Sequence, residues 1–452
     1  MDIEFLSREP VLDPDAFIGR AQEIAWAAAK LGGLRPQNCN IIGEPRSGKT
    51  SLLHHLYQQK VGLARQTPGL YVFVRLAALP EHNSATFWTA LLTELRREMV
   101  QAGLPPTAAV VEAPRDAYDQ IESEIELLLE ERGLRRIVFF IDDFDLMQAG
   151  LGRQDLDWLR ALANHYIETL AFVIGSASPL VKLTGGLVAD QVVSPLTNLF
   201  HEYWLPLLTP AEAEALCRQA AECDGRKLDP TAVAFLLAEA GRHPALLKIA
   251  CEALFAAPDA DFATIQSAVQ TDLQLNEHVN WICRQLWQRR SPAEQAALLG
   301  LAEGSVVAID NRRAAAHLQR LGLVEERGGR WTLFADLFRD WLLWETGGSH
   351  NRALSEEGLS GFAHLADERR AVVNGRSIPL TPLENRLLAY LSARPNEVCS
   401  TEELRAHVWS SDKSAAVVEK GVNRLRAKIE GDAARPRFIL SARGEGYLLR
   451  LP

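Results

Sequence analysis

The segment Gly43-Glu44-Pro45-Arg46-Ser47-Gly48-Lys49-Thr50 constrains this chain more than any other stretch of its sequence. It fits the pattern G-x-x-x-x-G-K-[ST] and lies between an apolar run, residues 38–42, and an apolar helix pattern, residues 49–57. Two glycines let the backbone approach a ligand closely, and N–H groups at a helix N-terminus bind phosphate. Lys49 would reach the β- and γ-phosphates, and the Thr50 hydroxyl would bind Mg²⁺. The pattern predicts a nucleotide-phosphate site that runs on into Ser51.

A second apolar run, residues 137–141, ends in Asp142 and Asp143. Acids at the end of an apolar strand complete such a site: Asp142 would hold the water shell of Mg²⁺, and Asp143 would orient and polarise the attacking water. Asp145 lies nearby and is predicted to cap a helix or to pair with another group rather than to catalyse. The next apolar run ends at Ser176, which either contacts the γ-phosphate or simply ends the strand.

Apolar runs alternate with helical patterns over the first half of the chain. Nearly all-apolar strands separated by helices indicate a parallel sheet covered on both faces, an α/β fold. The strands are expected at residues 38–42, 70–76, 137–141, 170–175 and 203–208, with helices at 21–30, 49–57, 84–101, 116–131 and 153–169.

Composition excludes several classes of protein. The apolar share of 47% and the charged share of 23% are typical of soluble proteins, and no run of about 18 apolar residues could span a membrane. The six cysteines form no C-x-x-C pair, and the N-terminal residues lack the apolar stretch of a secretory signal. We therefore expect a cytoplasmic protein with no membrane partner.

Charge is distributed unevenly along the chain. The whole sequence carries a net charge of −10, whereas residues 351–452 hold 16 Lys and Arg against 13 Asp and Glu. A mildly basic end on an acidic body indicates that any contact with nucleic acid belongs to the C-terminal region.

Five regions are expected along the chain. Residues 1–208 would bind nucleotide, residues 209–280 would form a helical lid, and residues 281–346 would form a winged helix with a hairpin turn at Gly328-Gly329. The Gly- and Ser-containing residues 347–361 would be a linker, and residues 362–452 a second winged helix.

Two short motifs, one before the phosphate loop and one far beyond it in the chain, carry a family resemblance. Phe17-Ile18-Gly19-Arg20 resembles the φ-φ-G-R signature of AAA+ and STAND ATPases, which lies near adenine in those proteins. Gly241-Arg242-His243-Pro244, after Leu205-Pro206-Leu207-Leu208-Thr209, resembles the lid motif of the STAND branch, in which the proline packs on the base. The resemblance spans residues 13–345 and implies ATP or ADP with Mg²⁺ as cofactors.

Two features depart from the STAND pattern. The chain has no long repeat array, and no arginine can be assigned as an arginine finger. Arg46 and Arg242 either sense the γ-phosphate or are ordinary surface charges. Hydrolysis is therefore expected to be slow and regulatory.

The C-terminal region has the pattern of a hairpin, three helices and a second hairpin. Asn374-Gly375 marks the first turn, Thr381-Pro382-Leu383-Glu384 starts a helix, and Ser400-Thr401-Glu402-Glu403 forms a capping box. A third helix is expected over residues 414–430, and Arg443-Gly444-Glu445-Gly446-Tyr447 would be the last turn.

These motifs closely resemble the OmpR/PhoB-type winged-helix DNA-binding domain. The resemblance implies that the third helix enters the major groove, with Glu419, Lys420 and Arg424 facing base edges. Asn423, Arg426 and Lys428 would face outward and position phosphates, and Arg443 would reach a minor groove. Gly421 in mid-helix and Asn423 at an often basic position depart from the family pattern and would weaken binding.

The sequence as a whole favours an ATP-switched, STAND-type transcriptional regulator that binds DNA. In its ATP state it could form a homo-oligomer, and it could receive its signal from an unidentified signalling protein. Two alternatives stay open. One is a defence or stress-response ATPase whose C-terminal domain senses or docks a protein or nucleic-acid partner. The other is an origin-recognition-like or transposition-helper AAA+ ATPase.

Overall fold

The computed structural model describes residues 9–64, 67–107, 111–184, 197–257, 262–304, 312–327, 330–346, 362–365, 369–373, 376–394, 397–409, 416–430, 436, 438–442 and 446–450. The chain divides into two units, each treated by itself below. The first comprises Met1–Asp229, Arg242–Lys248 and Arg320–Gly322, and the second comprises Pro230–Gly241, Ile249–Gln319 and Leu323–Pro452. Within the described residues, no helix is both long and apolar enough to cross a bilayer.

A parallel sheet forms the centre of the first unit. Its strand order is β2-β3-β4-β1-β5, and every neighbouring pair is parallel. The strands are β1 (Asn38–Ile42), β2 (Gly69–Arg75), β3 (Arg136–Asp142), β4 (Leu170–Ser176) and β5 (Phe200–Trp204). The α/β fold predicted from the alternating apolar runs is therefore confirmed.

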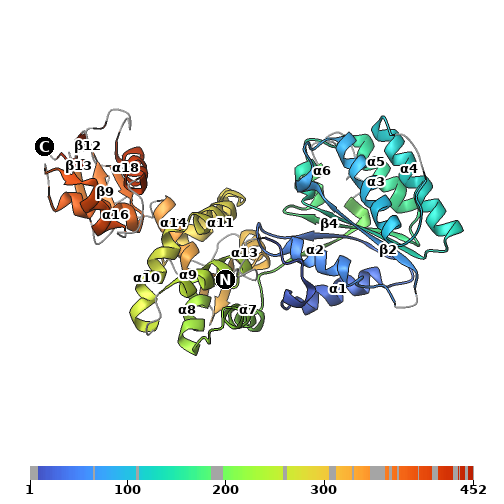
Figure 1. Cartoon of the computed structure of the whole chain (residues 1–452), viewed down its shortest axis with the longest axis horizontal. Coiled ribbons are helices and arrows are strands. Elements are labelled where there is room, and N and C mark those ends of the chain that lie inside the picture. Colours follow the sequence, from blue (N-terminus) through green and yellow to red (C-terminus); the bar gives the residue numbers. More distant parts are fainter. Residues whose placement is uncertain are drawn as a thin grey trace. The chain divides into compact units, whose positions relative to one another are not determined.

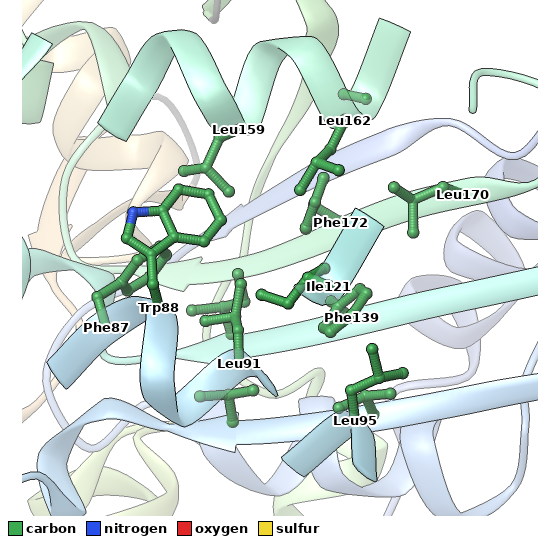
Figure 2. Packing of buried hydrophobic residues seen from close by; sticks show 14 of the residues in the cluster. Phe87, Trp88, Leu91, Leu95, Ile121, Phe139, Leu159, Leu162, Leu170 and Phe172 are labelled. Carbon is green, nitrogen blue, oxygen red and sulfur yellow. The ribbon is translucent and has the colours of Figure 1, made fainter. Parts of the chain in front are cut away.

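Helices cover both faces of this sheet (Figure 1). On one face lie α1 (Ala21–Leu31) and α2 (Lys49–Gln58); on the other lie α3 (Ser84–Gln101), α4 (Pro114–Glu126) and α5 (Arg153–His165). Figure 2 shows the apolar core between the sheet and α3, α4 and α5. It includes Phe87 and Trp88 of α3 and Phe139 and Phe172 of the sheet. Two further helices of this unit are α6 (Leu180–Thr184) and α7 (Pro210–Cys223).

The last strand differs from the expectation of residues 203–208. β5 starts at Phe200 and ends at Trp204, because Pro206 has no N–H with which to continue the ladder. The backbone N–H of Leu205 still donates to the Ile42 carbonyl over 2.7 Å. The residues that follow therefore leave the sheet edge next to the start of the phosphate loop.

The second unit begins with helices. They are α8 (Pro230–Ala240), α9 (Pro244–Ala256, whose first turn belongs to the first unit), α10 (Phe262–Leu275), α11 (Glu277–Gln288), α12 (Pro292–Ala302) and α13 (Arg312–Arg320). An antiparallel hairpin, β6 (Val324–Arg327) and β7 (Arg330–Leu333), and α14 (Asp336–Thr346) follow. The expected order of three helices and a hairpin is present; the Gly328-Gly329 turn lies outside the described residues.

The C-terminal region has the predicted order of elements, except that three strands rather than a two-stranded hairpin come before the helices. Three antiparallel strands precede the helices, and a hairpin follows them. The elements are β8 (Phe362–Leu365), β9 (Arg370–Val373), β10 (Arg376–Pro379), α16 (Pro382–Ser392), β11 (Cys399–Ser400), α17 (Thr401–Val408), α18 (Ala416–Ile429), β12 (Ile439–Ala442) and β13 (Gly446–Leu449). A capping box forms at Ser400, as predicted, and a second one forms at Thr381, the predicted helix start.

Gly421, which departs from the family pattern, has a packing reason. A Cβ atom at this position of α18 would lie 2.4 Å from Cζ2 of Trp409, so the indole packs directly against the helix backbone. Trp409 in turn packs on the apolar core of this domain. The glycine therefore weakens the helix intrinsically but allows a large aromatic contact.

We predict that Gly421→Ala destabilises α18, although alanine is the better helix former. The added methyl group must displace the indole, and such overpacking typically costs about 1–3 kcal/mol, more than the gain of about 1 kcal/mol in helix propensity. Amide hydrogen exchange of α18 should become faster. In a Trp409→Ala background the same substitution should instead slow exchange, and faster exchange there would contradict the packing explanation.

Candidate nucleotide-binding and DNA-binding sites

The phosphate loop lies between the end of β1 and the start of α2. Two of its residues have left-handed backbone conformations, Arg46 with φ 62° and Gly48 with φ 92°. Gly43 is required by close packing, because a Cβ atom there would lie 2.8 Å from Ser47 Oγ. The loop thus ends in a tight turn that leads into the N-terminus of α2, a geometry suited to binding an anion through backbone N–H groups.

Lys49 is held against its own loop. Its Nζ atom donates to the Gly43 carbonyl over 2.8 Å and to the Glu44 carbonyl over 3.1 Å. Burial lowers the pKa of Lys49, while the nearby carboxylates, first Asp142 and then Asp145, oppose the decrease. The ammonium is therefore positioned at the phosphate loop and faces the acids at the end of β3.

Asp142 has the properties expected of a magnesium-binding residue. Its side chain is fully buried, and within the described part of the chain neither carboxylate oxygen accepts a hydrogen bond of ordinary geometry. Burial raises its pKa to about 6, the Asp143 carboxylate adds to the rise, and the Thr50 hydroxyl and the Lys49 ammonium oppose it. A buried oxygen ligand without a partner, close to a hydroxyl, fits Mg²⁺, which keeps several waters and takes few protein ligands.

The neighbouring acids occupy distinct places. Asp143 is half-buried and has a left-handed backbone with φ 58°, which turns the chain sharply after β3. Asp145 accepts a hydrogen bond from the backbone N–H of Ala177 over 2.5 Å, so its predicted pairing role is confirmed. The Ser176 hydroxyl lies 2.9 Å from Asn40 Oδ1 and 2.8 Å from the Ser178 carbonyl. Contact of Ser176 with a phosphate stays a prediction.

The position of the Asp142 carboxylate depends on Gly175 of the adjacent strand. A Cβ atom at residue 175 would lie 2.7 Å from Asp142 Oδ1 and 2.5 Å from Leu53 Cδ1. The absence of a side chain therefore makes room for the carboxylate.

We predict that Gly175→Ala displaces the Asp142 carboxylate and weakens Mg²⁺-dependent ATP binding by about tenfold, as is typical for residues that orient metal ligands. Calorimetric titration with ATP, in the presence of Mg²⁺ or of EDTA, would measure the loss. Gly152→Ala is the matched control, because a Cβ atom there makes only an ordinary contact of 3.6 Å with Asp155 Oδ2. Wild-type Mg²⁺ dependence in Gly175→Ala would contradict this role.

Arg20 connects the phosphate loop to two other segments. Its guanidinium is 97% buried and donates to the Ser47 carbonyl over 3.0 Å, to the Pro206 carbonyl over 2.8 Å and to Glu23 Oε1 over 3.2 Å. Its backbone N–H donates to Glu212 Oε1 over 2.5 Å. Burial lowers the pKa of Arg20, and Glu23 and Glu212 oppose the change.

The rest of the φ-φ-G-R motif lies beside α2. The Phe17 ring stacks on His55 with centroids 4.3 Å apart, and Ile18 is half-buried. Gly19 has φ 70°, and a Cβ atom there would lie 2.5 Å from the Glu212 side chain. Val11 of the preceding segment donates its N–H to Ser51 Oγ over 3.0 Å. Contact of these residues with adenine stays a prediction.

His243 is a site residue that the sequence did not reveal. It is completely buried, and its Nε2 lies 3.3 Å from the carbonyl oxygen of Pro45 in the phosphate loop. Burial lowers its pKa to about 4, and the positive charges of Arg20 and Lys49 add to the decrease. Next to it, Arg242 donates to the Leu208 carbonyl over 2.8 Å, and Pro244 begins α9. The lid motif that contains His243 pointed to Pro244 and not to the histidine, because the importance of His243 lies in a contact between residues 198 positions apart.

The exposed face of α18 carries five of the seven predicted DNA-binding residues, Lys428 among them. Glu419, Lys420, Asn423 and Arg424 are exposed, while Val418, Val422, Leu425 and Ile429 are buried in the domain core. Arg424 also forms an ion pair with Glu277 of the same unit, in which the two side chains are 61% and 71% exposed. Exposed pairs contribute only about 0–1 kcal/mol, so this arginine is free to exchange carboxylate for phosphate.

The expected outward orientation of Arg426 is wrong. Its side chain is buried: Nε donates to the Ile439 carbonyl over 2.9 Å and Nη2 to Ser441 Oγ over 2.8 Å. Arg426 follows Val422 by four residues and so falls on the inner face of the helix, where it fixes β12. Lys428 donates to Glu384 Oε2 over 2.9 Å, and Arg443 lies outside the described residues.

The two sites define the class of protein: an AAA-type ATPase domain followed by a winged-helix domain of the OmpR/PhoB type. Residues 35–178 match the family model of the AAA domain, and residues 375–449 match the model of the C-terminal domain of transcriptional regulatory proteins. The winged-helix interpretation of the C-terminal region is thus confirmed by an independent comparison.

Similar proteins are found for each part. The transcriptional regulatory protein AfsQ1 of Streptomyces coelicolor is 39% identical over 98 residues, which are 21% of this chain and 44% of that protein. The DNA-binding response regulator MtrA of Mycobacterium tuberculosis is 42% identical over 76 residues, 16% of this chain and 33% of that protein. The chain therefore spans less than half the length of these relatives.

Among solved structures, a Walker-type ATPase of Pyrococcus abyssi has a similar fold. The match covers 75% of this chain and 99% of the archaeal one, with a TM-score of 0.52 and 14% sequence identity. At this identity the likeness concerns the fold alone.

Proposed function

We propose that this chain is a nucleotide-controlled transcriptional regulator of the STAND type, in which ATP or ADP with Mg²⁺ binds the AAA-type domain and DNA binds the C-terminal winged helix. The observation that carries the proposal is the presence, on one chain, of a phosphate loop with a buried unpartnered Asp142 and of an exposed α18 with Lys420 and Arg424. The names of the similar regulators support the DNA-binding half.

The residues at the sheet edge suit slow hydrolysis. Mg²⁺, held by Thr50 and Asp142, would neutralise phosphate charge, and Lys49 would contact the β- and γ-phosphates. Asp143, half-buried and one residue beyond Asp142, would accept the proton of a water whose oxygen bonds to the γ-phosphorus as the bond to the β–γ bridging oxygen breaks. A regulator needs the two nucleotide states to differ in their preferred conformation, because only differential affinity shifts an equilibrium.

Asp143→Asn should retain ATP binding and abolish turnover, because the amide still accepts hydrogen bonds but no longer takes a proton from water. We expect a decrease in the rate of phosphate release of at least about 100-fold, the contribution typical of a general base. Binding of ATP should stay within about threefold of the wild-type value, whereas Lys49→Ala should lose binding itself. An Asp143→Asn variant with unchanged turnover would exclude this residue as the base.

Selection of DNA from a random pool by the full chain, run with ATP–Mg²⁺ or with ADP, tests the DNA-binding half. We expect a defined sequence motif whose recovery depends on the nucleotide. Arg424→Ala should weaken binding to that motif by about 5- to 150-fold, since one base-reading side chain contributes about 1–3 kcal/mol.

Arg153→Ala is the matched control for that experiment, because it removes the same charge from a side chain that is 84% exposed in the other unit. Its binding should equal that of the wild type. Recovery of no motif in either nucleotide would overturn the DNA-binding proposal and favour a C-terminal domain that docks a protein.

A further inference from the structure

Four carbonyl groups of the phosphate loop are engaged by side chains. Lys49, a residue of the loop itself, donates hydrogen bonds to the carbonyls of Gly43 and Glu44. The other two are contacted from outside the loop, Ser47 by Arg20 and Pro45 by His243. Both outside residues are buried and come from segments far from the loop in sequence, so they fix its turn at two points.

Fixing a carbonyl also fixes the direction of an N–H group. A trans peptide is planar, so its C=O and the following N–H point in opposite directions. No cis peptide occurs among the described residues. Holding the Pro45 carbonyl therefore directs the Arg46 N–H away from His243, and holding the Ser47 carbonyl directs the Gly48 N–H away from Arg20. Consecutive N–H groups directed in this way are the donors with which a loop of this kind binds phosphate.

The hydrogen bonds of His243 fix its protonation as well as its place. Nδ1 accepts a hydrogen bond from the backbone N–H of Leu246 over 3.4 Å, at the start of α9. The proton of a neutral imidazole then resides on Nε2, which donates to Pro45. The charged groups that face this ring are Arg20 and Lys49, and both disfavour a second proton.

We propose that His243 is a positioning residue for phosphate recognition, a neutral donor that holds the Pro45–Arg46 peptide in its phosphate-binding orientation and couples the first turn of α9 to the nucleotide phosphates. This inference rests on the proposed nucleotide binding and adds His243 to the residues that support it. By reciprocity, bound phosphates stabilise the contact between the loop and α9 as much as the contact stabilises phosphate binding.

Two variants of the full chain separate the two hydrogen bonds of His243. His243→Asn retains an acceptor that caps α9 but is too short to reach Pro45, whereas His243→Gln retains the reach and loses the cap. Affinities for ADP and adenosine are measured by calorimetry, adenosine by competition. We expect ADP binding to weaken about tenfold in His243→Asn, because a buried carbonyl loses its donor, and to stay within about threefold in His243→Gln. Adenosine binding should change in neither variant.

The pH dependence distinguishes positioning from direct contact with the ligand. A neutral His243 predicts that the ratio of the ADP dissociation constants of His243→Asn and wild type stays constant between pH 6 and pH 8. A cationic histidine in contact with phosphate would make this ratio grow as the pH falls. That result would overturn the inference.

Three other outcomes also decide against it. Wild-type ADP affinity in His243→Asn, equal losses in both variants, or an equal loss of adenosine binding would each show that the contact with Pro45 does not position the phosphate loop. Failure of the wild-type chain to bind ADP at all would instead overturn the proposed nucleotide binding itself, and the two failures are therefore distinguishable.

Discussion

The guanidinium of Arg20 is a buried charge, and its requirements organise much of the first unit. An unpaired charge in the interior is very costly, so each of its donors must find an acceptor. Those acceptors are the Ser47 carbonyl in the phosphate loop, the Pro206 carbonyl beyond β5 and the Glu23 carboxylate on α1. One side chain thereby fixes the relative positions of three segments that lie far apart in the sequence. Movement of any of them would leave part of the charge without a partner.

The edge of the sheet concentrates carboxylates around a single lysine. Asp142 is buried with its pKa raised, and Lys49 is partly buried with its pKa lowered, so each charged form lacks its usual hydration. Asp145 is already engaged by the Ala177 backbone, which leaves Asp142 and Asp143 available for a ligand. A divalent cation that arrives with phosphate would reduce this excess of negative charge, because it would lie between the carboxylates and the phosphate oxygens.

In the C-terminal region the inner face of α18 sets the position of the outer face. The aliphatic side chains and the buried Arg426 hold the helix against β12, and Trp409 packs against Gly421. The rotation of α18 about its own axis is therefore fixed from within. This fixed rotation decides that Lys420 and Arg424, rather than Arg426, reach solvent.

The bounds of a helix or strand could be predicted from the sequence where one local pattern determines them. β1 and α3 have the predicted bounds, because an apolar run and a capped amphipathic pattern depend on near neighbours alone. Features that depend on distant partners were not predictable in this way. The role of Arg426 requires knowing that a strand carbonyl lies within reach of a buried guanidinium, and the reason for Gly421 requires placing an indole. His243 is the clearest case: only the fold brings the residue before α9 to the tip of the phosphate loop, and a histidine in a helix-starting motif carries no sign of it.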